Sequence, residues 1–127
     1  MLLEHIFSGT VSRWVRALAW LCVLTITVLS LLPGDERPHT GLSGRFEHAM
    51  AYAGTGFFFW FGYSVPRQRA LFWIGLAIAS GVFEVLQNFI PGRSPSIYDA
   101  LASTLGLTFG FMAAALLRWS LLRRERD

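Results

Sequence analysis

The sequence of 127 residues contains no lysine, a single cysteine and few charged residues of any kind. One thiol, Cys22, excludes a disulfide framework and a paired-cysteine metal motif. Charged residues make up 15% of the chain and hydrophobic residues 54%, a combination that is rare in soluble domains. The composition therefore argues against a soluble domain.

What the chain does contain is a series of long apolar runs, separated by short charged clusters, with a mean hydropathy of +0.47. A helix of about 20 mostly apolar residues is long enough to cross the hydrocarbon core of a bilayer. We therefore predict an all-α fold, a single polytopic membrane domain over residues 1–127. Its four transmembrane helices are predicted at about 14–32, 48–65, 70–90 and 97–117.

The first apolar run needs a separate argument, because Arg13 and Arg16 precede it as they would precede the core of a secretory signal. No small-x-small cleavage site follows this run, which stops at Pro33-Gly34. We therefore predict an uncleaved helix. Residues 66–69 are predicted to form a tight basic turn, and residues 91–96 a second turn.

All the basic residues are arginines, and they are unevenly divided between the two sides of the predicted bundle. One side has Arg13, Arg16, Arg67, Arg69, Arg118, Arg123, Arg124 and Arg126, whereas the other has Arg37, Arg45 and Arg93. Arginine-rich loops stay in the cytoplasm, so both termini and the 66–69 turn are predicted to be cytoplasmic. Arginines that flank apolar spans in this way also argue against nucleic-acid binding.

Ionisable residues from three predicted helices fall near the outer face, and Glu84 is the clearest of them. A charge at the centre of a membrane helix costs on the order of 3 kcal/mol, so such a residue normally has a partner inside the bundle. Gln87 lies one turn after Glu84, while His48 opens the second helix with Tyr52 one turn later. Glu84 and His48 are candidate acid and base groups, and the alternative for Glu84 is a structural carboxyl between helices.

Asp99 and Arg93 also have structural alternatives. Residues 96–99 have the form of a capping box, in which a serine and an acid satisfy the free amides at a helix start. Arg93 is a candidate to pair with a carboxylate, to bind an anion or to extend to the membrane interface. A metal site formed by His48, Glu84 and Asp99 is geometrically possible, but neither a metal nor another cofactor is predicted.

Small residues favour close packing of the last predicted helix. Gly106 and Gly110 have a G-x-x-x-G spacing, and Ser103 lies on the same face as Gly106. A face of this kind serves either internal packing or a homodimer, and the sequence leaves both open.

Four sequence elements follow one another in a defined order: Glu47-His48-x-x-x-Tyr52, Glu84-x-x-Gln87, Pro91-Gly92-Arg93-Ser94, and Asp99 with Gly106. Over about residues 33–117 their order and spacing resemble the VanZ-like family. Two positions depart from that family's pattern. The family often has Asp-Lys or a similar pair shortly before the histidine, where this chain has Arg45-Phe46-Glu47. The family also often has an asparagine four residues after the aspartate, where this chain has Ser103.

The resemblance implies a multi-pass protein of the bacterial cytoplasmic (inner) membrane. The founding member of the family is associated with resistance to the lipoglycopeptide teicoplanin. The predicted site combines conjectural catalytic residues, Glu84, His48 and Asp99, with predicted substrate-binding residues, Arg93, Gln87, Glu47, Ser94, Tyr52 and Ser103.

Three functions are consistent with these residues. The first is a site that binds or modifies an amphiphile at the outer leaflet: a lipid, a lipid-linked envelope precursor or a lipid-tailed antibiotic. The second is a small transporter or channel, against which the strong arginine asymmetry and the position of Glu84 in the third helix both count. The third is a structural or adaptor protein whose polar residues only fasten helices together. Whether there is catalytic turnover stays open.

Overall fold

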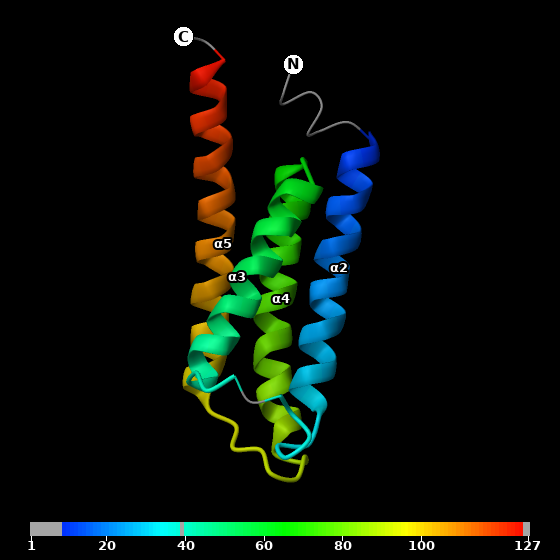
Figure 1. The fold of residues 1–127 in the computed structure, drawn as a ribbon, viewed down its shortest axis with the longest axis vertical. Helices are drawn as coiled ribbons and strands as arrows, with labels where there is room; N and C mark the ends of the chain where they lie inside the picture. The colour runs from blue at the N-terminus through cyan, green and yellow to red at the C-terminus, as the bar shows by residue number, and fades with distance from the viewer. Residues whose placement is uncertain (1–8, 39, 126–127) are drawn as a thin grey trace.

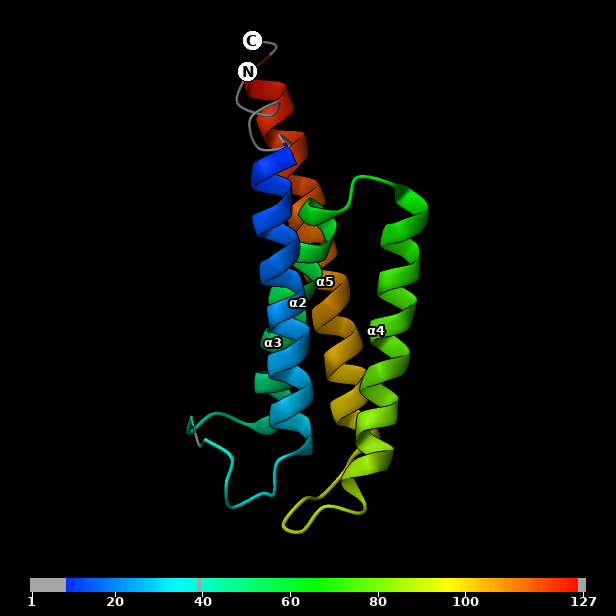
Figure 2. The same cartoon turned by 90° about the vertical axis from the view of Figure 1, so that its right-hand side faces the viewer.

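The computed structural model describes residues 9–38 and 40–125, and within them the chain is all-helical. The helices are α2 (Gly9–Leu31), α3 (Gly44–Gly62), α4 (Pro66–Gln87) and α5 (Ile97–Arg124). They run roughly along one axis (Figure 1). The start of α2, the α3–α4 connection and the end of α5 share one end of the bundle (Figure 2). Loops 32–43 and 88–96 lie at the opposite end, which we call the loop end.

Three helices are long and apolar enough to cross a membrane: Val11–Leu31 within α2, and the whole of α4 and of α5. Large apolar side chains point outward along them, with Ile78 62% and Leu105 69% exposed. Such surfaces suit contact with lipid and not with water. The helix α3 is not among the three, and its first turns carry Arg45, Glu47 and His48. The chain is therefore a helical membrane protein, with three candidate spans among the described residues.

The helix α3 packs most extensively on α5, through glycines. A Cβ atom at Gly106 would overlap the carbonyl oxygen of Ala49, and one at Gly110 would overlap that of Ala53. The close packing predicted from the G-x-x-x-G spacing is confirmed. This face of α5 is therefore covered by α3 and serves packing within the chain.

Several predicted boundaries are wrong. The helix α2 begins at Gly9 and not near residue 14, α3 spans Gly44–Gly62 and not 48–65, and α4 ends at Gln87 and not near residue 90. Residues 66–69 are not a turn: α4 begins at Pro66, since proline is well tolerated at the first position of a helix, where its missing N–H costs nothing. The connection is shorter, residues 63–65. Similarly, α5 does not stop near residue 117 but continues to Arg124. Its last turn carries Arg123 and Arg124, whose positive charges interact favourably with the negative end of the helix dipole.

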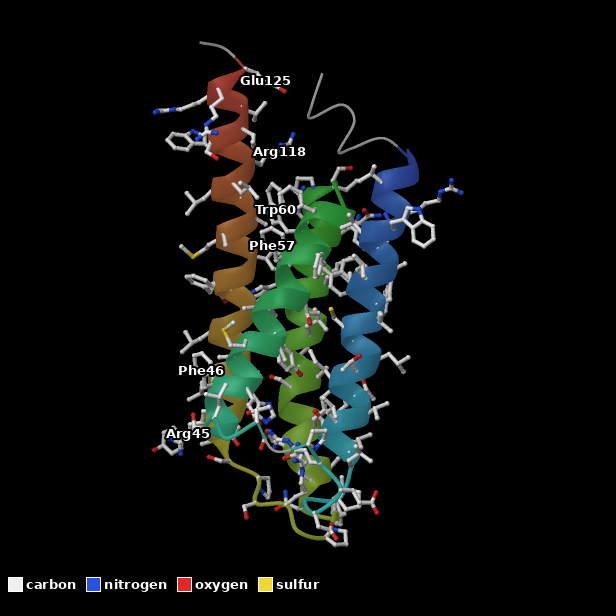
Figure 3. The ribbon with its side chains drawn as sticks, in the orientation of Figure 1. Arg45, Phe46, Phe57, Trp60, Arg118 and Glu125 are labelled. Atoms are coloured by element: carbon white, nitrogen blue, oxygen red, sulfur yellow. The ribbon has the colours of Figure 1, made fainter. Side chains whose placement is uncertain are left out.

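The end opposite the loops, which we call the aromatic end, is held by rings and arginines. The Phe72 ring lies tilted against those of Phe59 and Tyr63, with centroid distances of 4.5 and 4.4 Å. Arg69 Nε donates to the carbonyl oxygen of Tyr63 at 2.6 Å, and its guanidinium lies 3.8 Å from the centre of the Trp60 ring. Figure 3 shows Trp60 and Arg118 at this end and Arg45 at the other.

The loop end is held by backbone contacts between its two loops. The Gly34 N–H donates to the carbonyl oxygen of Pro91 at 3.1 Å. A Cβ atom at Gly34 would overlap the carbonyl oxygen of Gly92, whose φ of 71° suits glycine. The loop after α2 is therefore tied to the loop before α5.

Candidate functional site

Side chains from three helices converge at the loop end. His48 on α3, Glu84 on α4 and Asp99 on α5 each offer one donor atom, and these atoms all lie within 4.8 Å of one another. Local structure explains the convergence. Ser43 caps α3 just before His48 by accepting the N–H of Phe46, α4 ends three residues after Glu84, and α5 begins two residues before Asp99.

Glu84 is buried, with 7% of its surface exposed, and joins the end of α4 to the start of α5. Its Oε2 accepts the backbone N–H of Ser96 at 2.8 Å. The reciprocal half of the predicted capping box is therefore wrong, because the Ser96 N–H bonds to Glu84 and not to Asp99. The serine half is present, since Ser96 Oγ accepts the N–H of Tyr98 at 3.2 Å.

Arg93 and Gln87 both turn toward the end of α2. Arg93 Nη2 donates to the carbonyl oxygens of Leu29 and Ser30 at 3.2 and 2.9 Å, and Gln87 Nε2 donates to Ser30 at 3.2 Å. Within the described part of the chain, Arg93 forms no ion pair with Glu84 or Asp99, and its buried Nε has no hydrogen-bond partner. Burial and, less strongly, the nearby Arg37 lower the pKa of the Arg93 guanidinium, which stays a cation.

The remaining carboxylates are paired with arginines that the sequence analysis did not assign to the site. Glu47 forms an ion pair with Arg37 and also accepts a hydrogen bond from the Thr40 hydroxyl. Asp99 Oδ1 lies 3.4 Å from Arg45 Nε. Arg37 and Arg45 are two of the three arginines on the predicted outer side of the bundle, the side that also holds Glu47 and Asp99. This shared side is the sequence signal from which the two ion pairs could have been predicted.

The other predicted binding residues fall into two groups. Tyr52 is 2% exposed and forms the core with Ile26 and Leu107, although it also borders a cavity. Ser103 is buried, donates to the carbonyl oxygen of Asp99 at 2.9 Å, and places its Oγ 3.5 Å from His48 Nδ1. Ser94 lies in the loop beside Arg93 and lines a cavity.

Two adjoining cavities open beside these side chains. One, of about 420 Å³, has a mainly polar lining that includes Gln87, Ser94 and Asp99. The other, of about 190 Å³, is mainly apolar and lies between α2 and α3. They share five lining residues, which are Arg37, Thr40, Glu47, His48 and Arg93. The site therefore has a polar cavity, an apolar cavity and a charged border between them.

Comparisons with known protein families, with curated proteins and with solved structures found no match. The resemblance to the VanZ-like family therefore stays a prediction from the order of its motif residues.

Proposed function

We propose that this chain is a VanZ-like protein of the bacterial inner membrane that binds an amphiphile with an anionic head group at the loop end. The proposal is carried by one observation, the polar cavity that adjoins an apolar cavity across a border containing two arginines. A ligand that fits both cavities has a polar head and an apolar tail.

The border favours a negative head group. Arg37 and Arg93 line both cavities, and the Arg93 Nε is a buried donor without a partner among the described residues. An anionic oxygen would satisfy that donor with a charge-assisted hydrogen bond, which is about twice as strong as a neutral one. The planar guanidinium of arginine can also bind two oxygens of a phosphate or carboxylate at once, which a point charge cannot do.

The apolar cavity favours an alkyl tail. Its walls come from Ile26 and Leu29 on α2 and from Ala51 and Tyr52 on α3. Each methylene group that leaves water for such a wall contributes about 0.8 kcal/mol. The tail binds between α2 and α3, next to the surface that faces lipid.

The proposed membrane arrangement has four spans, with the loop end at the outer leaflet. The 19 residues of α3 give about 28 Å at 1.5 Å per residue, close to the thickness of the hydrocarbon core. Its charged first turns then lie at the interface with the loops. Arg13, Arg67 and Arg123 occupy the opposite side, which the distribution of arginines assigns to the cytoplasm.

Lipid binding by the purified chain tests this function. In detergent, we expect tighter binding of a fluorescent phosphatidylglycerol than of a phosphatidylcholine with the same acyl chains. Arg93→Gln should weaken phosphatidylglycerol binding about tenfold, the loss expected for a hydrogen bond to a charged group. Arg67→Gln, at an exposed arginine of the opposite end, is the matched control and should leave binding unchanged.

A second variant separates binding from folding, because Arg93 also contacts α2. Ala51→Phe should fill the apolar cavity and weaken the binding of both lipids, while the helix content of the variant matches that of the wild type. Equal affinity for the two head groups, or equal weakening by Arg93→Gln and Arg67→Gln, would overturn the proposal.

A structural role for the polar residues is the second candidate, favoured by the hydrogen bond from the Ser96 N–H to Glu84. Under it, Glu84→Gln lowers stability without a separate loss of binding. A transporter has less support, since the arginine asymmetry implies one fixed orientation.

A further inference from the structure

His48, Glu84 and Asp99 have the composition of a metal site, and the structure brings them together from three helices. One imidazole and two carboxylates suit a divalent transition-metal ion such as Zn²⁺ or Mn²⁺. Three protein ligands that leave a further position open are typical of catalytic zinc sites. We propose that this triad binds one divalent transition-metal ion, with Zn²⁺ as the first candidate.

The distances require only a small contraction. Metal–ligand bonds of about 2.0–2.2 Å place tetrahedral ligand atoms about 3.4 Å apart. The three donor atoms already lie within 4.8 Å of one another. Each ligand therefore has to move by on the order of 1 Å or less to reach a shared ion, which side-chain torsions can supply.

Glu84 supplies an observation that is independent of the clustering. Its side chain is buried, 7% exposed, yet Oε1 has no hydrogen-bond partner among the described residues. Oε1 is not one of the fully buried side-chain atoms without a partner among the described residues, so it faces open space and is accessible to an ion. An ion bound at Oε1 would satisfy this oxygen and leave the bond from the Ser96 N–H to Oε2 intact.

The surroundings of His48 favour the ligand form of its ring. Ser103 Oγ donates to the carbonyl oxygen of Asp99 and lies 3.5 Å from His48 Nδ1, where it can accept a hydrogen bond from the tautomer protonated at Nδ1. A proton on Nδ1 leaves the Nε2 lone pair for a metal, as in many metal sites where the second ring nitrogen is held by a hydrogen bond.

Charge supports the same assignment. Two carboxylates close together in a largely buried place repel each other, and a divalent cation removes that repulsion. Arg45 pairs with Asp99 at 3.4 Å, but its side chain is 62% exposed, and such an exposed ion pair is weak beside a bound divalent cation. His48 and Asp99 also line the polar cavity, so the open position of the ion faces the proposed head-group site.

The test is metal binding by the purified full-length chain in detergent, without added lipid. After treatment with a chelator, the wild type should take up one Zn²⁺ per chain in a calorimetric titration. Co²⁺ should give the visible absorption of a tetrahedral site that contains nitrogen and oxygen ligands. Glu84→Gln and Asp99→Asn should each weaken Zn²⁺ binding at least tenfold.

The controls are the same substitutions at exposed acids of the neighbouring loop. Glu36→Gln matches Glu84→Gln, and Asp35→Asn matches Asp99→Asn; both should bind Zn²⁺ as the wild type does. Asp99 is less buried than Glu84, which keeps the test informative if Glu84→Gln folds poorly. Absence of saturable binding by the wild type, or equal binding by Asp99→Asn and Asp35→Asn, would overturn the inference.

This result is independent of the proposed function, because no lipid is present in the titration. A chain that binds Zn²⁺ but shows no preference for anionic lipid would keep the metal site and lose the amphiphile proposal. A chain that prefers anionic lipid but does not bind Zn²⁺ would keep the amphiphile proposal and lose the metal site.

Discussion

The two ends of the bundle use arginine in different ways. At the aromatic end, Arg16 and Arg69 donate to the last carbonyl oxygens of α3, and Arg69 also stacks on the Trp60 ring. Arginine there completes a helix terminus, which otherwise leaves four carbonyl groups without partners.

At the loop end, arginines lie among carboxylates and border cavities. Arg37 pairs with Glu47, and Arg37 and Arg93 line both cavities. The comparison teaches that arginine number alone, which is larger at the aromatic end, does not locate a binding site. What marks the site is a mixture of charges around a cavity.

The largest expected effect concerns the α3–α5 contact that positions His48 at the loop end. Gly106→Val should strongly reduce the amount of folded protein, because even a Cβ atom there overlaps the backbone of Ala49. Gly54→Val is the matched control, since a Cβ atom at Gly54 meets no atom within 4 Å. Thermal unfolding in detergent measures both, and similar stabilities would show that the helix contact is looser than described.

The second effect concerns Glu84 and tests whether the loop end has a function that the aromatic end lacks. If the chain protects as the VanZ-like resemblance implies, the wild type should raise the inhibitory concentration of teicoplanin several-fold and leave that of vancomycin, which lacks the lipid tail, unchanged. Glu84→Ala at matched membrane abundance should abolish this protection. Equal protection by both proteins would exclude Glu84 from the activity.

A third, smaller effect is expected at the aromatic end. Arg69→Gln removes the bifurcated hydrogen bond from Nε to the carbonyl oxygens of Trp60 and Tyr63, together with the contact on the Trp60 ring, and should cost about 1–3 kcal/mol of stability. Binding of phosphatidylglycerol by the folded variant should stay as in the wild type. Weakened lipid binding at full stability would remove the distinction between the two ends.

The smallest expected effect on stability concerns a hydrogen bond midway between the two ends of the bundle. Trp73 Nε1 donates to Thr108 Oγ1 at 3.1 Å and links α4 to α5. Trp73→Phe should cost about 0.6 kcal/mol, the average for such bonds between membrane helices. A double-mutant cycle with Thr108→Val isolates this coupling energy, and a value near zero would show that packing alone joins the two helices.

Much of the fold could be predicted from the sequence, because apolar run length and arginine clusters directly reflect the bilayer. The predicted helix ends were wrong where local preference is ambiguous. Pro66 looked like a turn residue, yet it is also a favoured first helical residue, and Arg118 looked like the start of a tail although α5 continues through it.

For the site, depth along each helix correctly suggested that Glu84, His48 and Asp99 lie near one another. Which hydrogen-bond partner each of these residues has could not be predicted in the same way. Whether the Ser96 N–H meets Asp99 or Glu84 depends on how two helices approach, and this is set by contacts such as those of Gly106, far from either partner in the sequence. The cavities depend on the same packing, so no sequence pattern indicated them.

The tie between Gly34 and the 91–92 backbone also has a kinetic consequence. Because the two loops are fastened together at the loop end, we expect an apolar tail to enter the cavity between α2 and α3 sideways, from within the bilayer. An amphiphile that arrives by this route must first partition into the membrane. We expect a ligand delivered in the same vesicles as the protein to occupy the site faster than the same total amount delivered in separate vesicles, because only the first is already in the bilayer around the helices.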